Sequence, residues 1–520
     1  MPRCFCLLRS FGAVARALQD RRDLDAAEEG QYEGATVVDP TPGYYREPVF
    51  CLDFASLYPS LMRTMNLSPD TLVRDPAAGV PTNDIEISPG VTHRFVKGSV
   101  QVGLLPRILE QVLGERKRVK KLMEEEQDPR RRALLNSKQL ALKISANSIY
   151  GACGATKGRL SCRECAEATT AAGREAIAFT CRYVNALPGY EIVYGDTDSA
   201  FMRIPLEHRA APMPELFDIG EALARAVTLA IAAQMPGENV YIKLEFEKVL
   251  QNLCLYKKKR YAGICVDNPR KPGKVMAKGL ELVRKDACGL TKRGQRDVLN
   301  ALLFDCDLRK AADLMLAALE ELLTIPPGGP FDLLKQSKSL RADYKNSEGQ
   351  MHWRVKELMR EREPGSEPRV GDRVEFVVVA SSAPRVVDKV EDVGYAAAQK
   401  LPPDWLHYME AIEGPLMRLL EVPLQSTEPE LLQAVRTRCA ELRGRAQQLT
   451  VAHGLARRGT SWVWGHRARD GGVQLKLEVG LKRQADAQPC AEVRAPAAAR
   501  RRAAPGLPRG QQTLGFGGAP

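Results

Sequence analysis

Two short acidic segments carry the residue types most capable of chemistry in this chain. The first, Asp53–Ser60, has the sequence DFASLYPS, and the second, Tyr194–Ser199, has the sequence YGDTDS. Each follows an apolar run with strand character, so Asp53 and Asp198 are expected at strand ends. Carboxylates gathered there suit Mg²⁺, which takes a few hard oxygen ligands together with substrate phosphates. Two such ions about 3.5–4 Å apart can hold an attacking and a leaving oxygen in line, which predicts a two-metal site for nucleotidyl transfer.

Two long helices are expected between these segments. They cover Leu104–Gln127 and Arg130–Tyr150, Asp128-Pro129 separates them, and Gly151 is a reasonable stop for the second. Short strands with Pro and Gly turns precede them over residues 36–103. The pattern therefore predicts a helical hairpin that follows a strand-rich segment.

One face of this hairpin is polar where a core helix would be apolar. On the second helix, Gln139, Lys143 and Asn147 lie one turn apart from each other. On the first helix, Arg116 and Lys120 are also one turn apart. An Arg side chain can bind two phosphate oxygens, and a Lys side chain acts as a point charge. The hairpin is therefore predicted to bring the triphosphate of a nucleotide to the metals.

Composition limits the class of partner and the compartment. The formal net charge of +12 favours a polyanionic partner, because Lys and Arg that neutralise phosphates release counterions. The 13 cysteines are scattered, and Cys162-x-x-Cys165 has no second Cys or His pair at zinc-site spacing. We interpret them as reduced intracellular thiols and expect neither a zinc nor an iron–sulfur module. No apolar stretch reaches the roughly 20 residues of a membrane span, so no membrane partner is expected.

Ordered motifs now give a family resemblance. The chain resembles family B DNA polymerases, and most of all their delta-type catalytic subunits, over about residues 30–450. The four main motifs, in order, are DFASLYPS, KQLALKISANSIYGACGA, VYGDTDS and KKRYAG. The resemblance implies an α/β fold, a right-hand polymerase with an antiparallel-sheet palm, helical-hairpin fingers, a mainly helical thumb and a disordered basic tail.

The resemblance also divides the chain. The implied segments are 1–103, an N-terminal segment and the first part of the palm; 104–152, the fingers; 153–287, the rest of the palm; 288–455, the thumb; and 456–520, a C-terminal extension that is disordered from about 483. Within the thumb, a Gly and Pro-rich break is expected near residues 363–373.

Site residues follow from the matching positions. The resemblance implies that Asp53 and Asp198 bind two Mg²⁺ ions and that Asp196 is a weaker contributor to catalysis. It implies that Ser56 and Leu57 present backbone groups along the triphosphate of a dNTP.

The sugar, the phosphates and the base would be contacted by further matching side chains. The ring of Tyr58 would lie beneath the sugar and exclude a 2′-hydroxyl. The cations that would grip the triphosphate are Arg116, Lys120 and Lys143. Asn147 and Tyr150 would line the nascent base pair.

The primer-template DNA would be held by a basic element and by the start of the thumb. The matching residues are Lys258, Lys259, Arg260, Tyr261, Lys278 and Arg284. A basic tetrad is usually a solvated face, but this one contains an aromatic residue and stands beside the other motifs. Contacts of this kind are mainly to the DNA backbone and carry affinity without sequence preference.

Two departures from the delta-type pattern affect the expected function. Only 52 residues precede Asp53, which is too short for the proofreading exonuclease of that family, so we expect no proofreading by this chain. The carboxy-terminal cysteine modules of the family have no counterpart here. The end of the chain instead carries Gln511, Leu514 and Phe516, which partly resemble a sliding-clamp-binding peptide.

Alternative functions stay open at this point. A truncated or inactive polymerase could act only as a DNA-binding or scaffold protein, and a reverse transcriptase or a translesion enzyme are rivals among polymerases. Nuclear localisation, or a viral replication site, fits the resemblance. The Arg-rich first 22 residues also resemble a mitochondrial presequence, although a basic surface helix explains them better.

Overall fold

The computed structural model describes residues 32–75, 79–156, 158, 160–235 and 237–456. All of these residues belong to one unit of the chain, which lies within residues 1–460. The predictions for the N-terminal presequence, the disordered tail and the clamp-binding peptide therefore lie outside the described residues.

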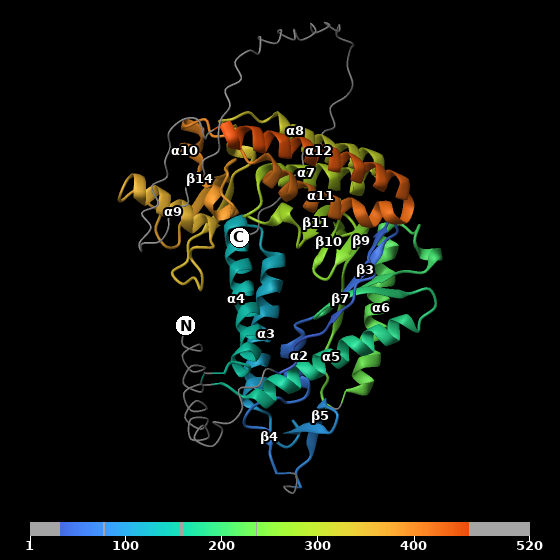
Figure 1. Ribbon diagram of the computed structural model, residues 1–520. Coiled ribbons are helices and arrows are strands. Elements are labelled where there is room, and N and C mark those ends of the chain that lie inside the picture. Colours follow the sequence, from blue (N-terminus) through green and yellow to red (C-terminus); the bar gives the residue numbers. More distant parts are fainter. Residues whose placement is uncertain (1–31, 76–78, 157, 159, 236, 457–520) are drawn as a thin grey trace, which may run out of the picture. The chain divides into compact units, whose positions relative to one another are not determined.

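An antiparallel sheet forms the centre of the part that carries both acidic motifs (Figure 1). Its strands are β1 (Val37–Val38), β2 (Gly43–Tyr45), β3 (Val49–Phe54), β7 (Glu191–Asp196), β8 (Ser199–Arg203), β9 (Leu244–Lys257), β10 (Arg260–Val266) and β11 (Lys274–Lys278). The order is β1-β7-β8-β3-β9-β10-β11, and β2 pairs with β9. The strand β3 thus lies between β8 and β9, in the middle of the sheet.

Helices cover one face of this sheet. They are α2 (Leu57–Thr64), α5 (Arg163–Asn185) and α6 (Met213–Gln234), with the short 3₁₀ turn η3 (Leu206–His208) before α6. Phe50, Leu52 and Phe54 alternate along β3 and share a buried cluster with α5 and α6. A small sheet of β4 (Leu72–Val73), β6 (Val91–Val96) and β5 (Thr82–Ser88) packs against α5. The alternation of apolar residues fixes which face of β3 is covered.

The expected helical hairpin is present as α3 (Leu104–Glu125) and α4 (Pro129–Cys153), which lie side by side (Figure 1). The side chain of Asp128 caps α4 by accepting a hydrogen bond from the N–H of Arg130 at 3.1 Å. The expected stop at Gly151 is wrong, because α4 continues through this glycine to Cys153. The helix ends at Gly154, whose N–H donates to the carbonyl of Tyr150.

The residues after β11 form a largely helical part with its own buried cluster. Its helices are α7 (Gly289–Asn300), α8 (Leu308–Thr324), α9 (Met351–Arg362), α10 (Val393–Ala398), α11 (Trp405–Thr427) and α12 (Pro429–Ala456), with short turns η4 (Glu281–Val283), η5 (Ala301–Asp305), η6 (Phe331–Leu333) and η7 (Val386–Lys389). A three-stranded antiparallel sheet is also present, in the order β12 (Gln336–Ser339), β13 (Arg373–Val378) and β14 (Val390–Asp392).

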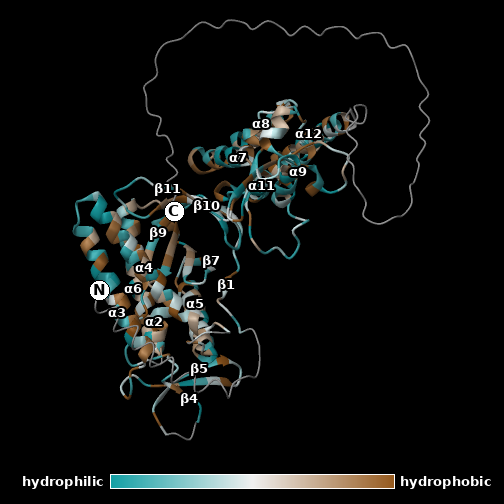
Figure 2. Ribbon diagram, turned by 90° about the vertical axis from the view of Figure 1, so that its left-hand side faces the viewer, coloured by the Kyte–Doolittle hydropathy of each residue, from teal (hydrophilic) through white to brown (hydrophobic). Residues whose placement is uncertain are grey.

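The Gly and Pro-rich break expected at 363–373 is confirmed, since α9 ends at Arg362 and β13 begins at Arg373. The helices show both hydrophilic and hydrophobic faces, as expected where one side packs on a core (Figure 2). Within the described ranges, none of the helices combines the length and the apolar character that a membrane crossing needs.

Candidate active site

The alternation along β3 places Asp53 on the face of the sheet opposite to α5 and α6. Val49 and Cys51, which have the same parity as Asp53, are buried in a separate cluster with Tyr194 and Tyr261. Asp53 is the next residue on this face and is only partly buried. The strand therefore delivers a carboxylate to the end of a buried row of side chains.

The second motif forms the tight turn between β7 and β8, next to Asp53. Thr197, at the turn, has a left-handed backbone with φ of 62°, which is uncommon for a residue other than glycine. The N–H of Phe54 donates to the carbonyl of Asp198 at 2.8 Å, and Asp53 pairs with Ser199 in the β3–β8 register. Two segments far apart in the sequence thus place Asp53 and Asp198 together.

The two carboxylates lie in a shared electrostatic environment. Burial, together with the charges of Asp198 and Glu247, raises the pKa of Asp53 to about 7, against an ordinary value of 3.8. Burial also raises the pKa of Asp198. The positive charge of Lys143, from α4, lowers both pKa values, so one of the predicted cations of the hairpin acts on both predicted metal ligands.

Two residues on β9 that the sequence analysis did not single out belong to this environment. Glu247 contributes to the raised pKa of Asp53, and Lys248 pairs with Glu247 through its Nζ at 2.6 Å. The register places Glu245 opposite Asp53. The sequence KLEFEK already indicates that Glu245 and Glu247 lie on the same face of a strand. It does not indicate which strand lies beside them, because that depends on pairing between segments far apart in the sequence.

The helix α2 begins directly after Asp53 and Phe54. Ser56, at its N-cap, has a left-handed backbone with φ of 54°, and within the described residues no side chain caps this end. Uncapped N–H groups at a helix N-terminus bind anions such as phosphate. The side chain of Leu57 is buried, so this residue has only its backbone to offer a ligand.

The hairpin contacts this end of α2 through Arg116. Its Nη1 donates to Oγ of Ser56 at 3.3 Å, and its Nε donates to Oε1 of Gln139 at 3.5 Å. Lys120, Lys143 and Asn147 are exposed on the same hairpin. Arg116 thus contacts the first motif directly, and Lys143 is exposed to solvent although its charge acts on both carboxylates.

Tyr58 also contacts the hairpin from α2. Its ring lies against that of Tyr150, with the centroids 4.5 Å apart. On its other side the ring of Tyr58 packs closely against α5. A Cβ atom at Gly173 of this helix would lie only 3.0 Å from the ring. The hydroxyl of Tyr150 lies 3.3 Å from that of Tyr32. Packing on two sides holds the Tyr58 ring in one position.

The basic element lies at the turn between β9 and β10. Nζ of Lys259 lies 3.4 Å from Oδ1 of Asp196, and Nζ of Lys258 lies 2.8 Å from Oδ1 of Asp39. The N–H of Lys259 donates to the hydroxyl of Tyr194 at 2.8 Å. Asp196 therefore has a cation as its neighbour.

The other predicted DNA-binding residues differ in exposure. Tyr261 is only 9% exposed, and its ring packs against Phe201 at 5.2 Å, so it supports the turn from inside the sheet. Arg260 is partly buried, and Lys278 is exposed. Arg284 is also exposed and forms two hydrogen bonds with Asp286, at 3.2 and 3.1 Å.

The carboxylate pair fits a divalent cation when substrate supplies further ligands. Among the residues that the structure describes, no group of three or more His, Cys, Asp or Glu could hold a metal ion by itself. Asp53 and Asp198 have raised pKa values because burial and nearby carboxylates oppose their charge, and a cation would relieve this. Mg²⁺ commonly takes one or two carboxylates and completes its shell with phosphates and water.

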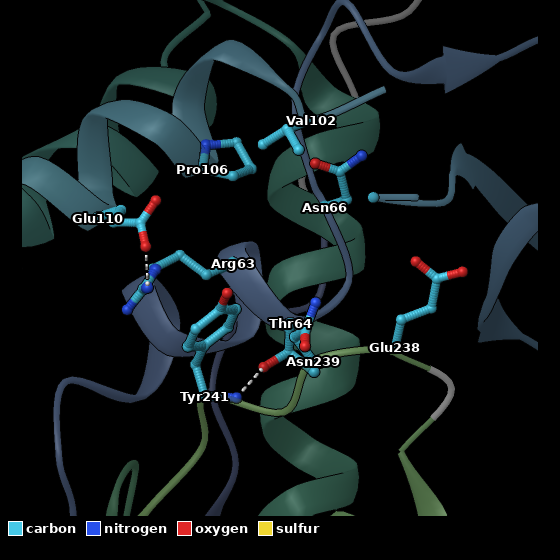
Figure 3. A pocket seen from close by; sticks show the side chains of 10 residues that line it. Arg63, Thr64, Asn66, Val102, Pro106, Glu110, Glu238, Asn239 and Tyr241 are labelled. Atoms are coloured by element: carbon cyan, nitrogen blue, oxygen red, sulfur yellow. Dashed lines mark hydrogen bonds and ion pairs between the residues drawn. The ribbon is translucent and has the colours of Figure 1, made fainter. Parts of the chain in front are cut away.

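A hollow at the other end of α2 has a different character (Figure 3). Arg63 lies there over the ring of Tyr241 at 3.7 Å and pairs with Glu110 at 3.3 Å. The N–H of Tyr241 donates to Oγ1 of Thr64 at 2.9 Å. These paired groups connect α2 to α3 and to the segment before β9, so we assign this hollow a structural role.

Comparison with known proteins identifies the class. The sequence profile of DNA polymerase family B matches residues 3–422, and the chain belongs to this family. It is 37% identical over 428 residues to the DNA polymerase delta catalytic subunit of Arabidopsis thaliana, covering 79% of this chain and 38% of that protein. The subunit of Bos taurus is 39% identical over 428 residues, covering 78% and 37%.

A third relative shows a similar identity and a similar coverage. The delta catalytic subunit of Plasmodium falciparum is 37% identical over 412 residues, covering 76% of this chain and 36% of that protein. The chain thus spans less than two fifths of the length of the curated relatives it matches.

Proposed function

We propose that the chain is a template-directed DNA polymerase that adds dNTPs to the 3′-hydroxyl of a primer. The observation that carries the proposal is that two distant motifs meet: the N–H of Phe54 donates to the carbonyl of Asp198, and the charge of Lys143 acts on both carboxylates. Membership of family B and similarity to delta catalytic subunits give the substrate class. The central sheet would be the palm, α3 and α4 the fingers, and residues 288–455 the thumb.

Asp53 and Asp198 would hold two Mg²⁺ ions. When bound, such ions lower the pKa of a hydroxyl, align the reacting oxygens and offset the charge on phosphates. The contribution of the protein is to hold the two carboxylates in fixed positions. Their strands share a hydrogen bond and the row of side chains behind Asp53 is buried, so little reorganisation is needed when substrate arrives.

The dNTP would lie between the start of α2 and the hairpin. The N–H groups at the start of α2 would donate hydrogen bonds to the triphosphate, with Arg116, Lys120 and Lys143 as cations around it. The fixed ring of Tyr58 would leave no room for a 2′-hydroxyl, which selects a deoxyribose. Asn147 and Tyr150, on the same side of α4, would contact the base pair that forms.

The primer-template would cross the β9–β10 turn. Lys258, Lys259 and Arg260 would contact the DNA near the primer end, with Tyr261 holding the turn from within. Because Lys259 is paired with Asp196, DNA that binds Lys259 would also change the surroundings of the catalytic turn. Lys278 and Arg284 would contact backbone phosphates further along the duplex.

Primer extension tests this proposal. Purified full-length protein, a primed DNA template, Mg²⁺ and four dNTPs should give extension by the wild type and none by Asp198→Asn. The Asp313→Asn variant, at an exposed position on α8, is the matched control and should extend normally.

The outcome separates the candidate functions. An Asp198→Asn protein that extends at the normal rate would refute the assignment of the site. If wild type and variant bind primed DNA equally and neither extends it, a DNA-binding or scaffold function replaces polymerisation. Extension on an RNA template in preference to DNA would favour a reverse transcriptase.

A further inference from the structure

Two cysteines lie side by side at the start of α5, where the proposed polymerase chemistry has no use for them. Cys162 is the N-cap residue of α5, and Cys165 lies three residues later. Their sulfur atoms are 3.1 Å apart. Cys165 is fully buried, whereas Cys162 is 8% exposed. Cys162 is thus the less buried residue of the pair.

The separation of the two sulfurs is short enough for a covalent bond to form with a small movement. A disulfide has its sulfurs about 2.05 Å apart, so an approach of about 1 Å is needed. Rotation about the Cα–Cβ bonds of the two residues, together with a small shift of the backbone at the start of α5, can provide it. A shared metal is not favoured, because the described part of the chain has no group of three or more ligands that could hold one.

We propose that Cys162 and Cys165 form a redox site that hydroperoxides oxidise to a disulfide and that dithiols reduce again. In the first step the Cys162 thiolate attacks one oxygen of H₂O₂. The S–O bond forms, the O–O bond breaks, and hydroxide leaves and takes a proton to give water. In the second step the Cys165 sulfur, on losing its proton, attacks the sulfenic sulfur. The S–S bond forms and a second water leaves.

The environments of the two thiols assign these roles. Burial raises the pKa of the Cys165 thiol well above its usual range, so this thiol stays protonated until a partner is formed next to it. Cys162 is the N-cap residue of α5, and its Sγ donates to Oε2 of Glu164 at 3.6 Å. The less buried cysteine is therefore the one that reacts first, and the fully buried one resolves the intermediate.

The pair is connected to the end of the hairpin. The N–H of Cys162 donates to the carbonyl of Cys153, the last residue of α4, at 2.9 Å. One turn earlier on α4 is Tyr150, which stacks on Tyr58. Drawing the Cys162 sulfur toward Cys165 would move a backbone group that holds the base of α4. We infer that the disulfide slows nucleotide addition, and this second part rests on the proposed function.

Thiol mapping of the full-length protein tests the redox site itself. The wild type is treated with H₂O₂, free thiols are alkylated, and peptides are analysed by mass spectrometry. The expected result is that Cys162 and Cys165 lose alkylation together, in a peptide lighter by two hydrogens, and that dithiothreitol restores both. Alkylation of both residues after treatment, a bond from Cys162 to Cys153, or stoichiometric zinc that is released on oxidation would each overturn the proposal.

Two variants sharpen the test. Cys165→Ser should stop at a sulfenic acid on Cys162, which dimedone traps. Cys181→Ser changes a partly buried cysteine on the same helix and should form the disulfide normally. If Cys165→Ser does not fold, Cys165→Ala takes its place, and mapping of the wild type decides independently of either variant.

Primer extension then tests the connection to α4. The oxidised wild type should extend about tenfold more slowly, since a displacement of about 1 Å at a positioning group costs up to about 10²-fold. Dithiothreitol should restore the rate, and peroxide should not slow Cys165→Ser. A disulfide that leaves extension unchanged would overturn the connection to α4. Absence of extension by the reduced wild type would count against the proposed function, and the mapping would still decide the redox site.

Discussion

The central sheet and the α3–α4 hairpin carry complementary parts of the candidate site, but the structure holds them very differently. Five of the 6 residues of β3 are buried, and Asp53 is the exception. In α4, only Gln139, Ala146, Ile149 and Cys153 are buried among 25 residues, and Ile144 is 65% exposed. Asp53 is thus attached to a strand that is otherwise fixed in a core, and the cations are carried on a helix pair of which few residues are buried.

This difference suggests a division of labour. Metal ligands have to keep a fixed separation, which a buried central strand provides. Groups that grip a substrate and release a product have to move, and segments with few buried contacts open at low free-energy cost. Near the candidate site, the contacts between the hairpin and α2 include the Arg116–Ser56 hydrogen bond and the Tyr58–Tyr150 ring pair, and the Arg63–Glu110 ion pair connects the other end of α2 to α3. Variants at the sheet, the hairpin and this junction should therefore fail in different ways.

The largest effect is expected from the sheet. Replacing Asp53 with Asn should lower the rate of primer extension by at least about 10³-fold, because a neutral amide cannot offset a divalent cation. The double variant with Asp198→Asn should be no worse than either single variant, since residues that act as a unit are not additive. The rates come from single-turnover extension at saturating dNTP.

Binding of primed DNA to both Asn variants should stay near that of the wild type, as measured by fluorescence anisotropy. If the double variant lost activity as the product of the two single losses, the two carboxylates would not act as one site. The idea that the sheet holds the two carboxylates as one fixed site would then be wrong.

The hairpin should give a smaller loss that affects binding and rate together. Lys143→Ala is expected to lower kcat/KM for dNTP by about 10²-fold, because charge develops on phosphate oxygens in the transition state. KM should rise and kcat should fall, as measured by steady-state single-nucleotide insertion. Lys138→Ala, on the same helix but paired with Glu115 at 2.8 Å, is the matched control and should change either value little.

A Lys143→Ala protein with a raised KM and an unchanged kcat would contradict this expectation. Such a result would mean that the cation acts only on the bound ground state. The hairpin would then collect the nucleotide without contributing to the reaction.

The junction should control the choice of sugar. Tyr58→Ala removes the ring that lies between Tyr150 and Gly173, so ribonucleotides should be accepted about 10-fold to 10²-fold more readily relative to deoxynucleotides. Competing insertion of rNTP and dNTP measures this ratio. Tyr58→Phe keeps the ring and should retain the selectivity of the wild type. Equal loss of selectivity in both variants would indicate that the hydroxyl, and not the ring, excludes the 2′-hydroxyl.

Sequence alone predicted most of what depends on local pattern. The strand character before Asp53 and Asp198, the hairpin and the break after α9 are confirmed, because alternation, helix start signals and Gly or Pro clusters are local. The hairpin boundary at Gly151 was wrong, since a glycine in an exposed helix costs only about 1 kcal/mol and does not end it by itself. The three-stranded sheet within the largely helical C-terminal part was also not foreseen.

What sequence could not predict depends on distant pairing. Glu247 reaches Asp53 only because β9 pairs with β3, and the irregular register between Cys51 and Leu52 decides which side chains face each other. Tyr261 looked like part of an exposed basic run, but alternation on β10 turns its ring into the sheet. Such outcomes are set by the order of strands, which no local pattern encodes.

The smallest expected effect concerns stability. It tests how much the buried position of Asp53 lowers the free energy of unfolding. The pKa of Asp53 is raised to about 7 in the folded protein by burial and by the charges of Asp198 and Glu247. The folded state therefore binds this proton more tightly than the unfolded state does. Stability from this source is fully present below about pH 4 and is lost as the pH rises to about 7.

Without metal, Asp53→Asn should thus be more stable than the wild type at pH 8, by about 1–2 kcal/mol. This is less than the full shift would give, because the carboxyl keeps part of its surface exposed. The gain should shrink at pH 5, where the wild-type carboxyl is mostly protonated. Urea unfolding in EDTA at both pH values measures it, with Asp313→Asn as the control. An equal gain at both pH values would mean that packing, and not charge, makes the difference. A gain confined to pH 8, and abolished by adding Mg²⁺, would show that the rigid sheet holds its carboxylates in a costly arrangement that a cation relieves.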